Sequence, residues 1–141
     1  LPDDIYVIED RVTGICREDH DIRLYYNFAF GHLDGENGKF DYTSQKGRGY
    51  TMTVQADKKL DFEILEGSEN PIGGWISYGY AWRKPIPQLI AKHSGKAPIH
   101  FITVLAPEGT KAETAINGDA AMVTLAGGKV LTLTENAVEL H

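Results

Sequence analysis

The sequence predicts an all-β protein, an antiparallel β-sandwich of about ten short strands. Three observations support this fold class. Apolar and polar residues alternate with a period of two in several segments, which is the pattern of a half-buried strand. Turn residues recur every several positions, and no segment keeps the period of a helix. A βαβ fold would need helices between its strands, so the pattern favours a sandwich.

The clearest strand is segment 22–30, whose even positions are all apolar or aromatic: Ile22, Leu24, Tyr26, Phe28 and Phe30. Only an extended chain places these side chains on one face and the intervening residues on the other. Segments 50–55 and 60–64 alternate in the same way, with threonines or carboxylates between their apolar residues. We predict a strand in each of these segments.

Other strands are predicted from weaker patterns. Segment 5–12 mixes apolar and charged residues, whereas segment 100–105 is apolar on both faces and is predicted to be a central strand. An Asn-Gly pair at 117–118 favours a type I′ hairpin, and a Gly-Gly pair at 127–128 favours a second reversal. Three short strands are therefore predicted at the end of the chain, at 113–116, 121–125 and 130–134.

Two segments are predicted to lie outside the main strands. Segment 31–49 is the longest irregular stretch and is predicted to be a loop, a common place for recognition on a rigid sandwich. Its Asp-Gly-Glu-Asn-Gly sequence at 34–38 lacks the ligand spacing of a calcium loop, so we interpret it as a polar turn. Segment 85–90 has two prolines at alternate positions, which predict an extended edge or entry segment.

Length and charge narrow the classes of function. The chain has 141 residues and a formal net charge of −6. This length suits one domain with its own core, so we predict a single β-sandwich domain over residues 1–141. The negative charge argues against nucleic acid or a membrane surface as a partner. The chain begins at Leu1 without an initiator Met or a signal peptide, and we interpret it as a fragment of a larger multidomain protein.

No sequence pattern predicts catalytic machinery. The chain has no nucleophile elbow, phosphate-binding loop or dinucleotide-binding glycine motif. Its five histidines form no metal-binding pair, and no two carboxylates stand out in an apolar setting as an acid and a base. The single cysteine, Cys16, is interpreted as a small half-buried hydrophobic residue. We therefore predict no catalytic residue, no metal and no cofactor within these residues.

Segment 73–85 contains the densest cluster of aromatic residues. As one strand it would place Trp75 on one face and Tyr78, Tyr80 and Trp82 on the other. Aromatic rings can stack on the apolar faces of sugars, while neighbouring cations pair with carboxylate or sulfate groups. The alternative interpretation is ordinary packing between strands or sheets. The candidate substrate-binding residues are Tyr78, Tyr80, Trp82, Arg83, Lys84 and His93.

A family resemblance begins in this cluster. The run Gly-Trp-Ile-Ser-Tyr-Gly-Tyr at 74–80 is followed by Lys-Pro-Ile-Pro-Gln-Leu at 84–89 and by Pro-Ile-His-Phe-Ile-Thr-Val-Leu-Ala-Pro at 98–107. Together with the opening segment 6–14, these motifs resemble the C-terminal β-sandwich region of heparinase II/III-like polysaccharide lyases. The resemblance spans most of the chain.

The resemblance implies a parent enzyme with an N-terminal helical toroid and a C-terminal antiparallel sheet domain. Such lyases cleave uronate-containing polysaccharides by β-elimination, and the family's catalytic Asn, Tyr and His motifs have no counterpart here. It thus implies a non-catalytic module that braces the N-terminal catalytic domain and contacts an acidic polysaccharide, in the periplasm or outside the cell. Two alternatives stay open: an independent carbohydrate-binding or adhesin-like sandwich, and a purely structural module that docks on its neighbour.

Overall fold

The computed structural model describes residues 4–14 and 17–141. This part of the chain is built from strands, as the sequence predicts, but it contains sixteen of them where about ten were expected. The extra strands are short hairpin partners. The strands are β1 (Tyr6–Val12), β2 (His20–Asn27), β3 (Gly31–Glu36), β4 (Lys39–Ser44), β5 (Gly49–Ala56), β6 (Asp61–Glu66), β7 (Ser68–Glu69), β8 (Ile72–Gly73), β9 (Trp75–Gly79), β10 (Trp82–Pro85), β11 (Pro87–Gly95), β12 (Ile99–Pro107), β13 (Ala112–Asn117), β14 (Ala120–Leu125), β15 (Val130–Thr134) and β16 (Ala137–Leu140).

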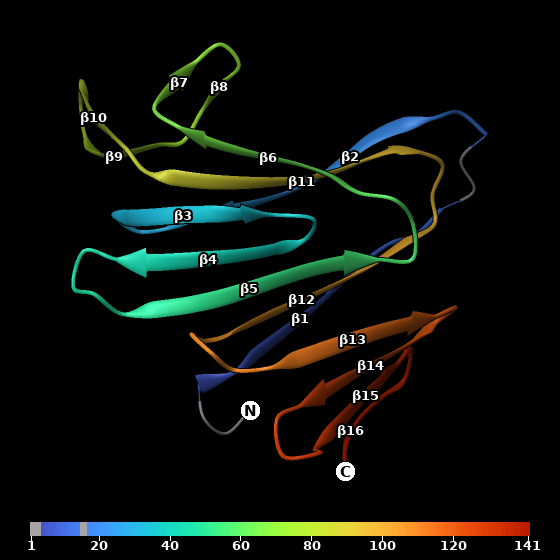
Figure 1. Ribbon diagram of the computed structural model, residues 1–141. Helices are drawn as coiled ribbons and strands as arrows, with labels where there is room; N and C mark the ends of the chain where they lie inside the picture. Colours follow the sequence, from blue (N-terminus) through green and yellow to red (C-terminus); the bar gives the residue numbers. More distant parts are fainter. Residues whose placement is uncertain (1–3, 15–16) are drawn as a thin grey trace.

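Three antiparallel sheets form the body of the molecule. The central sheet has the strand order β1-β12-β5-β4-β3. A three-stranded sheet, β2-β11-β6, lies on one side of it, and the C-terminal sheet, β13-β14-β15-β16, lies on the other. In Figure 1 the three-stranded sheet is at the top and the C-terminal sheet at the bottom, with the central sheet between them. The predicted sandwich is confirmed, and a further sheet covers part of its outer face.

The first core lies between the central sheet and the three-stranded sheet. Its buried side chains come from alternate positions of facing strands, and Leu24 and Tyr26 of β2 pack against it as the alternation in 22–30 predicts. A phenylalanine pair joins the two layers, with the ring centroids of Phe40 and Phe62 5.3 Å apart. The buried members of this core are Leu33, Phe40, Tyr42, Met52, Val54, Leu89 and Ala91.

The second core lies between the opposite face of the central sheet and the C-terminal sheet. Even-numbered residues of β12, from Ile102 to Ala106, point into this core, while Leu105 on the other face packs against the first core. The strand is therefore apolar on both faces because it separates two cores. The prediction that 100–105 is a central strand is confirmed, since β12 lies between β1 and β5.

The predicted loop at 31–49 is instead a hairpin of the central sheet. Strands β3 and β4 pair in register from Gly31–Ser44 to Glu36–Lys39. Asn37 and Gly38 both have positive φ, 54° and 81°, which is the backbone of a type I′ turn. A side chain at Gly38 would meet the Val54 carbonyl oxygen at 2.6 Å, so this turn also needs glycine for space. The Asn-Gly pair thus closes a hairpin, and the polar turn expected at 34–38 is only its tip.

The prediction of an edge or entry segment at 85–90 is also wrong in part. Strand β11 begins at Pro87 and pairs with β2 on one side and β6 on the other, so it is the middle strand of its sheet. Proline is tolerated because it occupies the first position of the strand, where an amide is not needed to continue the ladder. Leu89 and Ala91 then lie fully buried in the first core.

A buried polar cluster joins the central sheet to the C-terminal sheet. Nε2 of His100 lies 2.7 Å from Oε1 of Glu9, and the carboxylate can only accept, so this nitrogen donates. Arg11 donates to the same oxygen at 2.7 Å and to the Asp119 carbonyl oxygen, also at 2.7 Å. Through these contacts, β1 and β12 are tied to the turn between β13 and β14.

Candidate functional site

The aromatic segment 73–85 is a two-stranded hairpin. The single strand expected from the sequence divides at residues 80 and 81, and β9 pairs with β10 from Gly79–Trp82 to Trp75–Pro85. Ala81 turns the chain with a φ of 56°. The hydroxyl of Ser77 lies 2.9 and 2.6 Å from the carbonyl oxygens of Gly79 and Trp82, and the single proton that it shares between these two acceptors holds the turn.

The hairpin displays three aromatic side chains to solvent. Tyr80 at the turn is fully exposed, Tyr78 is largely exposed, and Trp82 is exposed on one side. The rings of Tyr78 and Trp82 lie next to each other, with centroids 5.4 Å apart and planes inclined by 36°. These three residues therefore do not pack in the core, and the alternative of inter-sheet packing is wrong for them. The structure brings them together as an open aromatic surface.

Trp75 belongs to the hairpin's support and not to its open surface. It is half-buried, and its indole Nε1 donates to the Ser68 carbonyl oxygen at 2.9 Å. The guanidinium carbon of Arg83 lies 4.1 Å from the centre of its ring. A half-buried indole that donates a hydrogen bond and is covered by a cation is a structural anchor for the hairpin.

The two basic residues of the hairpin differ in their charge balance. Arg83, which lies at a bulge in β10, pairs with Glu69 at 2.6 Å, so part of its charge is compensated. Nζ of Lys84 lies 5.3 Å from the ring centre of Trp82. Within residues 4–14 and 17–141, no carboxylate lies within 4.0 Å of Lys84. Lys84 is thus the cation of this surface that is best placed to pair with an anion.

His93 lies apart from the hairpin. It is six residues beyond Pro87 on β11, which corresponds to about 20 Å along an extended strand. Its Nδ1 lies 3.0 Å from the Lys59 carbonyl oxygen, and its Nε2 is buried without a hydrogen-bond partner among the described residues. The aromatic–basic surface therefore consists of Tyr78, Tyr80, Trp82, Arg83 and Lys84, without His93. Next to Trp82 and Arg83 is a shallow pocket of about 350 Å³.

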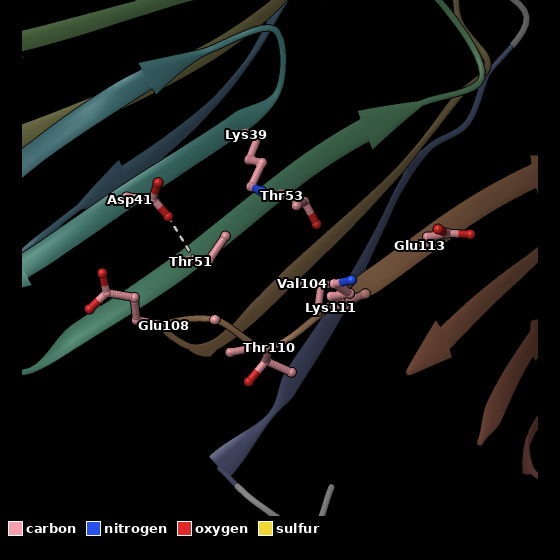
Figure 2. Close-up of a pocket in the computed structure, with 12 residues that line it drawn as sticks. Lys39, Asp41, Thr51, Thr53, Val104, Glu108, Thr110, Lys111 and Glu113 are labelled. Carbon is pink, nitrogen blue, oxygen red and sulfur yellow. Dashed lines mark hydrogen bonds between the residues drawn. The ribbon is translucent and has the colours of Figure 1, made fainter. Parts of the chain in front are cut away.

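A second concave site was not predicted from the sequence. It is a groove of about 670 Å³ on the outer face of β4 and β5, walled by the β12–β13 connection (Figure 2). Thr51 donates to Asp41 at 2.7 Å on its floor. Lys39 and Lys111 bring positive charge to it, while Asp41, Glu108 and Glu113 bring negative charge. Apolar and polar residues alternate in segment 39–43, and Phe40 and Tyr42 face the core. This alternation could have predicted from the sequence that the residues between them line the opposite face.

The part of the chain that the structure describes contains no group of three or more His, Cys, Asp or Glu side chains able to hold a metal ion. Cys16 lies outside the described residues. Among the described residues, no helix has the length and apolar character needed to cross a membrane.

Comparison with solved structures identifies the fold. The chain superposes on the heparinase III-BT4657 gene product with a TM-score of 0.70 at 16% sequence identity, over 92% of this chain and 22% of that one. A form of the same gene product with methylated lysines gives a TM-score of 0.69 at 16% identity, over 92% and 21% of the two chains. No protein-family model and no curated protein sequence matches the chain. The chain thus has the fold of a segment of heparinase III, and it spans about a fifth of the length of that protein.

Proposed function

We propose that the chain is a non-catalytic C-terminal β-sandwich module of a heparinase II/III-like polysaccharide lyase. The observation that carries this proposal is the agreement of two independent likenesses. The sequence motifs at 74–80, 84–89 and 98–107 resemble that region of the family, and nearly the whole chain has the fold of a heparinase III segment. In this proposal the module braces the catalytic toroid of its parent protein, which works in the periplasm or outside the cell.

The aromatic–basic surface is the proposed contact with an acidic polysaccharide. Tyr78, Tyr80 and Trp82 expose ring surface to solvent, and Lys84 brings an ammonium group beside the Trp82 ring. A sugar ring stacked on Trp82 would place its carboxylate or sulfate near Lys84, where charge-assisted hydrogen bonds are strong. Hydrogen bonds from Ser77 hold the turn, so little ordering is needed on binding.

The exposed aromatic surface also favours a second candidate, an independent carbohydrate-binding or adhesin-like module. Both candidates predict glycan binding at the hairpin, but only the first places a helical catalytic domain before this chain in the same polypeptide. The sequence of the full gene separates them. A helical region with the Asn, Tyr and His motifs of the lyases supports the first candidate, whereas a glycosidase or a cell-wall anchor contradicts it.

Two measurements on the 141-residue chain test the function. Incubation with heparin, heparan sulfate or alginate is expected to give no rise in ultraviolet absorbance, and appearance of the unsaturated uronate product would refute the non-catalytic assignment.

Binding to the same glycans is measured by calorimetry or by retention on a glycan column. Trp82→Ala and Lys84→Ala are expected to weaken binding by about tenfold each. Met122→Ala and Lys129→Ala, at exposed positions in the C-terminal sheet and a nearby turn, are the matched controls. Equal binding by all four variants would exclude the hairpin as the glycan site.

A further inference from the structure

Strand β1 is one of the two edge strands of the central sheet, and β3 is the other. Among the residues that the structure describes, β1 pairs with β12 on one side and has no strand on the other. About half of the backbone N–H and C=O groups of such an edge strand point away from its partner and can bind a further strand. The second half of β1 carries the charged residues Glu9, Asp10 and Arg11, whereas the first half, Tyr6–Ile8, is apolar and lacks this protection.

One face of this edge has apolar side chains that the three-stranded sheet does not cover. Tyr6 pairs with Leu105, which packs on the first core, and Ile8 pairs with Thr103, which contacts β2. Paired residues of neighbouring strands share a face, so Tyr6 and Ile8 point toward the first core. They nevertheless remain 59% and 42% exposed. The three-stranded sheet therefore ends before it reaches β1.

On the opposite face, the C-terminal sheet extends past β1. Its first strand, β13, lies beside β12, because Lys111–Glu113 line the groove with Val104 and the turn after β13 reaches His100. The groove lies on the side of β12 that faces β5, away from β1, and no residue of β14 lines it. The strands β14, β15 and β16 therefore follow in the other direction, across β12 and β1. Strand β16 lies beyond the last strand of the central sheet.

Two apolar side chains lie on the underside of this overhang. Val138 and Leu140 of β16 pair with Leu133 and Leu131, which are buried in the second core, so all four share one face. Val138 and Leu140 are nevertheless 66% and 47% exposed. They face the space in which the next strand of the central sheet would lie, about 5 Å from β1.

We propose that the β1 edge receives an added β-strand with apolar side chains on both faces, contributed by the polypeptide of the parent protein outside these 141 residues. One row of its side chains covers Tyr6 and Ile8, and the other row fills the space under Val138 and Leu140. Its backbone pairs with the free groups of β1. The identity of the donor rests on the proposed function, since about four fifths of the heparinase III chain lies outside the matched segment. The capacity of the edge for a strand rests on the geometry alone.

A second copy of this chain fits the edge less well than a single strand. Antiparallel pairing of two β1 strands about a two-fold axis perpendicular to the sheets would place both C-terminal sheets on the same side. Each of these sheets overhangs its own β1, so the two β16 strands would compete for one space. A single added strand brings no sheet with it and meets no such obstacle.

The edge can be tested with a peptide probe on the 141-residue chain. The probe is a capped, fluorescently labelled peptide with the sequence of residues 99–107, flanked by lysines, because β12 is the strand that already pairs with β1 and is apolar on both faces. Hydrogen exchange is expected to show new protection of β1 amides, and anisotropy is expected to show binding. Ile8→Lys and Leu140→Lys should weaken binding by about tenfold, since each places a charge against the bound strand. Ile72→Lys, at another exposed apolar position, is the matched control.

The outcomes separate the edge from its donor. Equal peptide affinity of Ile8→Lys and Ile72→Lys, or protection at β3 in place of β1, would overturn the added-strand proposal. A dimer in sedimentation that Ile8→Lys dissociates would show that a second copy occupies the edge and would equally overturn it.

In the full-length parent protein, β1 amides should exchange more slowly than in the 141-residue chain. If the parent protein has a helical catalytic domain but its β1 amides exchange as fast as in the 141-residue chain, the parent polypeptide does not supply the added strand. The proposed function would still stand. A parent without that domain would contradict the proposed function and leave the peptide result intact.

Discussion

The hydroxyl groups of Tyr26 and Thr103 lie 2.6 Å apart and form one hydrogen bond between the three-stranded sheet and a fully buried residue of strand β12. Either oxygen can be the donor, and the other is then the acceptor; neither hydroxyl has a second hydrogen-bond partner among the described side chains. Burial raises the pKa of the Tyr26 phenol, and the bond to Thr103 opposes that shift. This pair is a polar contact between the two layers of the first core.

Replacing Thr103 with Val is expected to lower the free energy of unfolding by about 1–3 kcal/mol, because the half-buried Tyr26 hydroxyl is left without its partner. Thr124→Val on the exposed face of β14 is the control and should change stability by less than about 0.5 kcal/mol. Urea unfolding at neutral pH measures both. The double variant Tyr26→Phe/Thr103→Val should recover part of the loss, and no recovery would show that the cost comes from packing alone.

Replacing His100 with Leu is expected to destabilise the chain by about 1–3 kcal/mol. The substitution removes the donor that Glu9 meets inside the junction between the central and C-terminal sheets. His141→Leu is the matched control, since His141 pairs with Glu139 at the exposed end of the chain and such pairs contribute little. Chemical denaturation of both variants checks the difference. A loss of equal size at His141 would contradict a special role for the buried cluster.

The ionised carboxylate of Asp21 is expected to stabilise the folded state at neutral pH and to lose this effect in acidic solution. A hydrogen bond from Ser94, followed by contacts with Lys92 and Arg23, lowers its pKa from 3.8 to about 2. Because the folded-state pKa is below the unfolded-state value, this contribution is fully present above about pH 4 and is lost as the pH falls toward about 2. The difference in stability between the wild type and Asp21→Asn should shrink over that interval. Carbon-detected NMR titration measures the pKa directly, and Ser94→Ala should raise it. An unchanged pKa in Ser94→Ala would contradict the assigned cause.

Two glycines of similar backbone conformation should respond differently to alanine. Gly38 and Gly47 have φ values of 81° and 77°. A Cβ atom at Gly38 would meet the Val54 carbonyl oxygen at 2.6 Å, whereas none of the described atoms outside its immediate chain neighbours lies within 4 Å of one at Gly47. Gly47→Ala should therefore cost about 1–2 kcal/mol, from the left-handed backbone alone. Gly38→Ala should cost more, because the backbone of β5 must also shift. Thermal unfolding compares the two, and equal losses would show that β5 yields freely.

The fold class was predictable because alternation is a local property of the sequence. Segments 22–30, 50–55 and 60–64 could be assigned as strands without any knowledge of the strands beside them. The hairpin at 31–44 is missed from the sequence, although the similar pair Asn117-Gly118 predicts a hairpin. That second hairpin exists, but the predicted type I′ turn is wrong in its detail, because Asn117 pairs with Ala120 and only Gly118 of the pair has positive φ. In the hairpin at 31–44, the glycines and charged residues that precede the turn obscured the alternation of Leu33, Phe40 and Tyr42.

The candidate site was predictable in composition but not in exposure. The sequence places Tyr78, Tyr80 and Trp82 close together, but whether they are buried depends on which sheet covers the hairpin. His93 was grouped with them because of its basic neighbours, and the length of β11 separates it from them. The groove beside Asp41 combines β4, β5 and the β12–β13 connection, so only tertiary structure could bring its residues together.

The pairing of β1 with β12 has a consequence for how the protein is made. Strand β1 is synthesised before residues 99–107 and must wait for them before it can pair, and both cores depend on β12, which those residues form. Contacts this distant in sequence slow folding, since the chain closes a long loop before the contacts form. During that interval the apolar Tyr6–Ile8 segment is exposed on the nascent chain. We expect a chaperone that binds unfolded chains to bind this segment and prevent its aggregation.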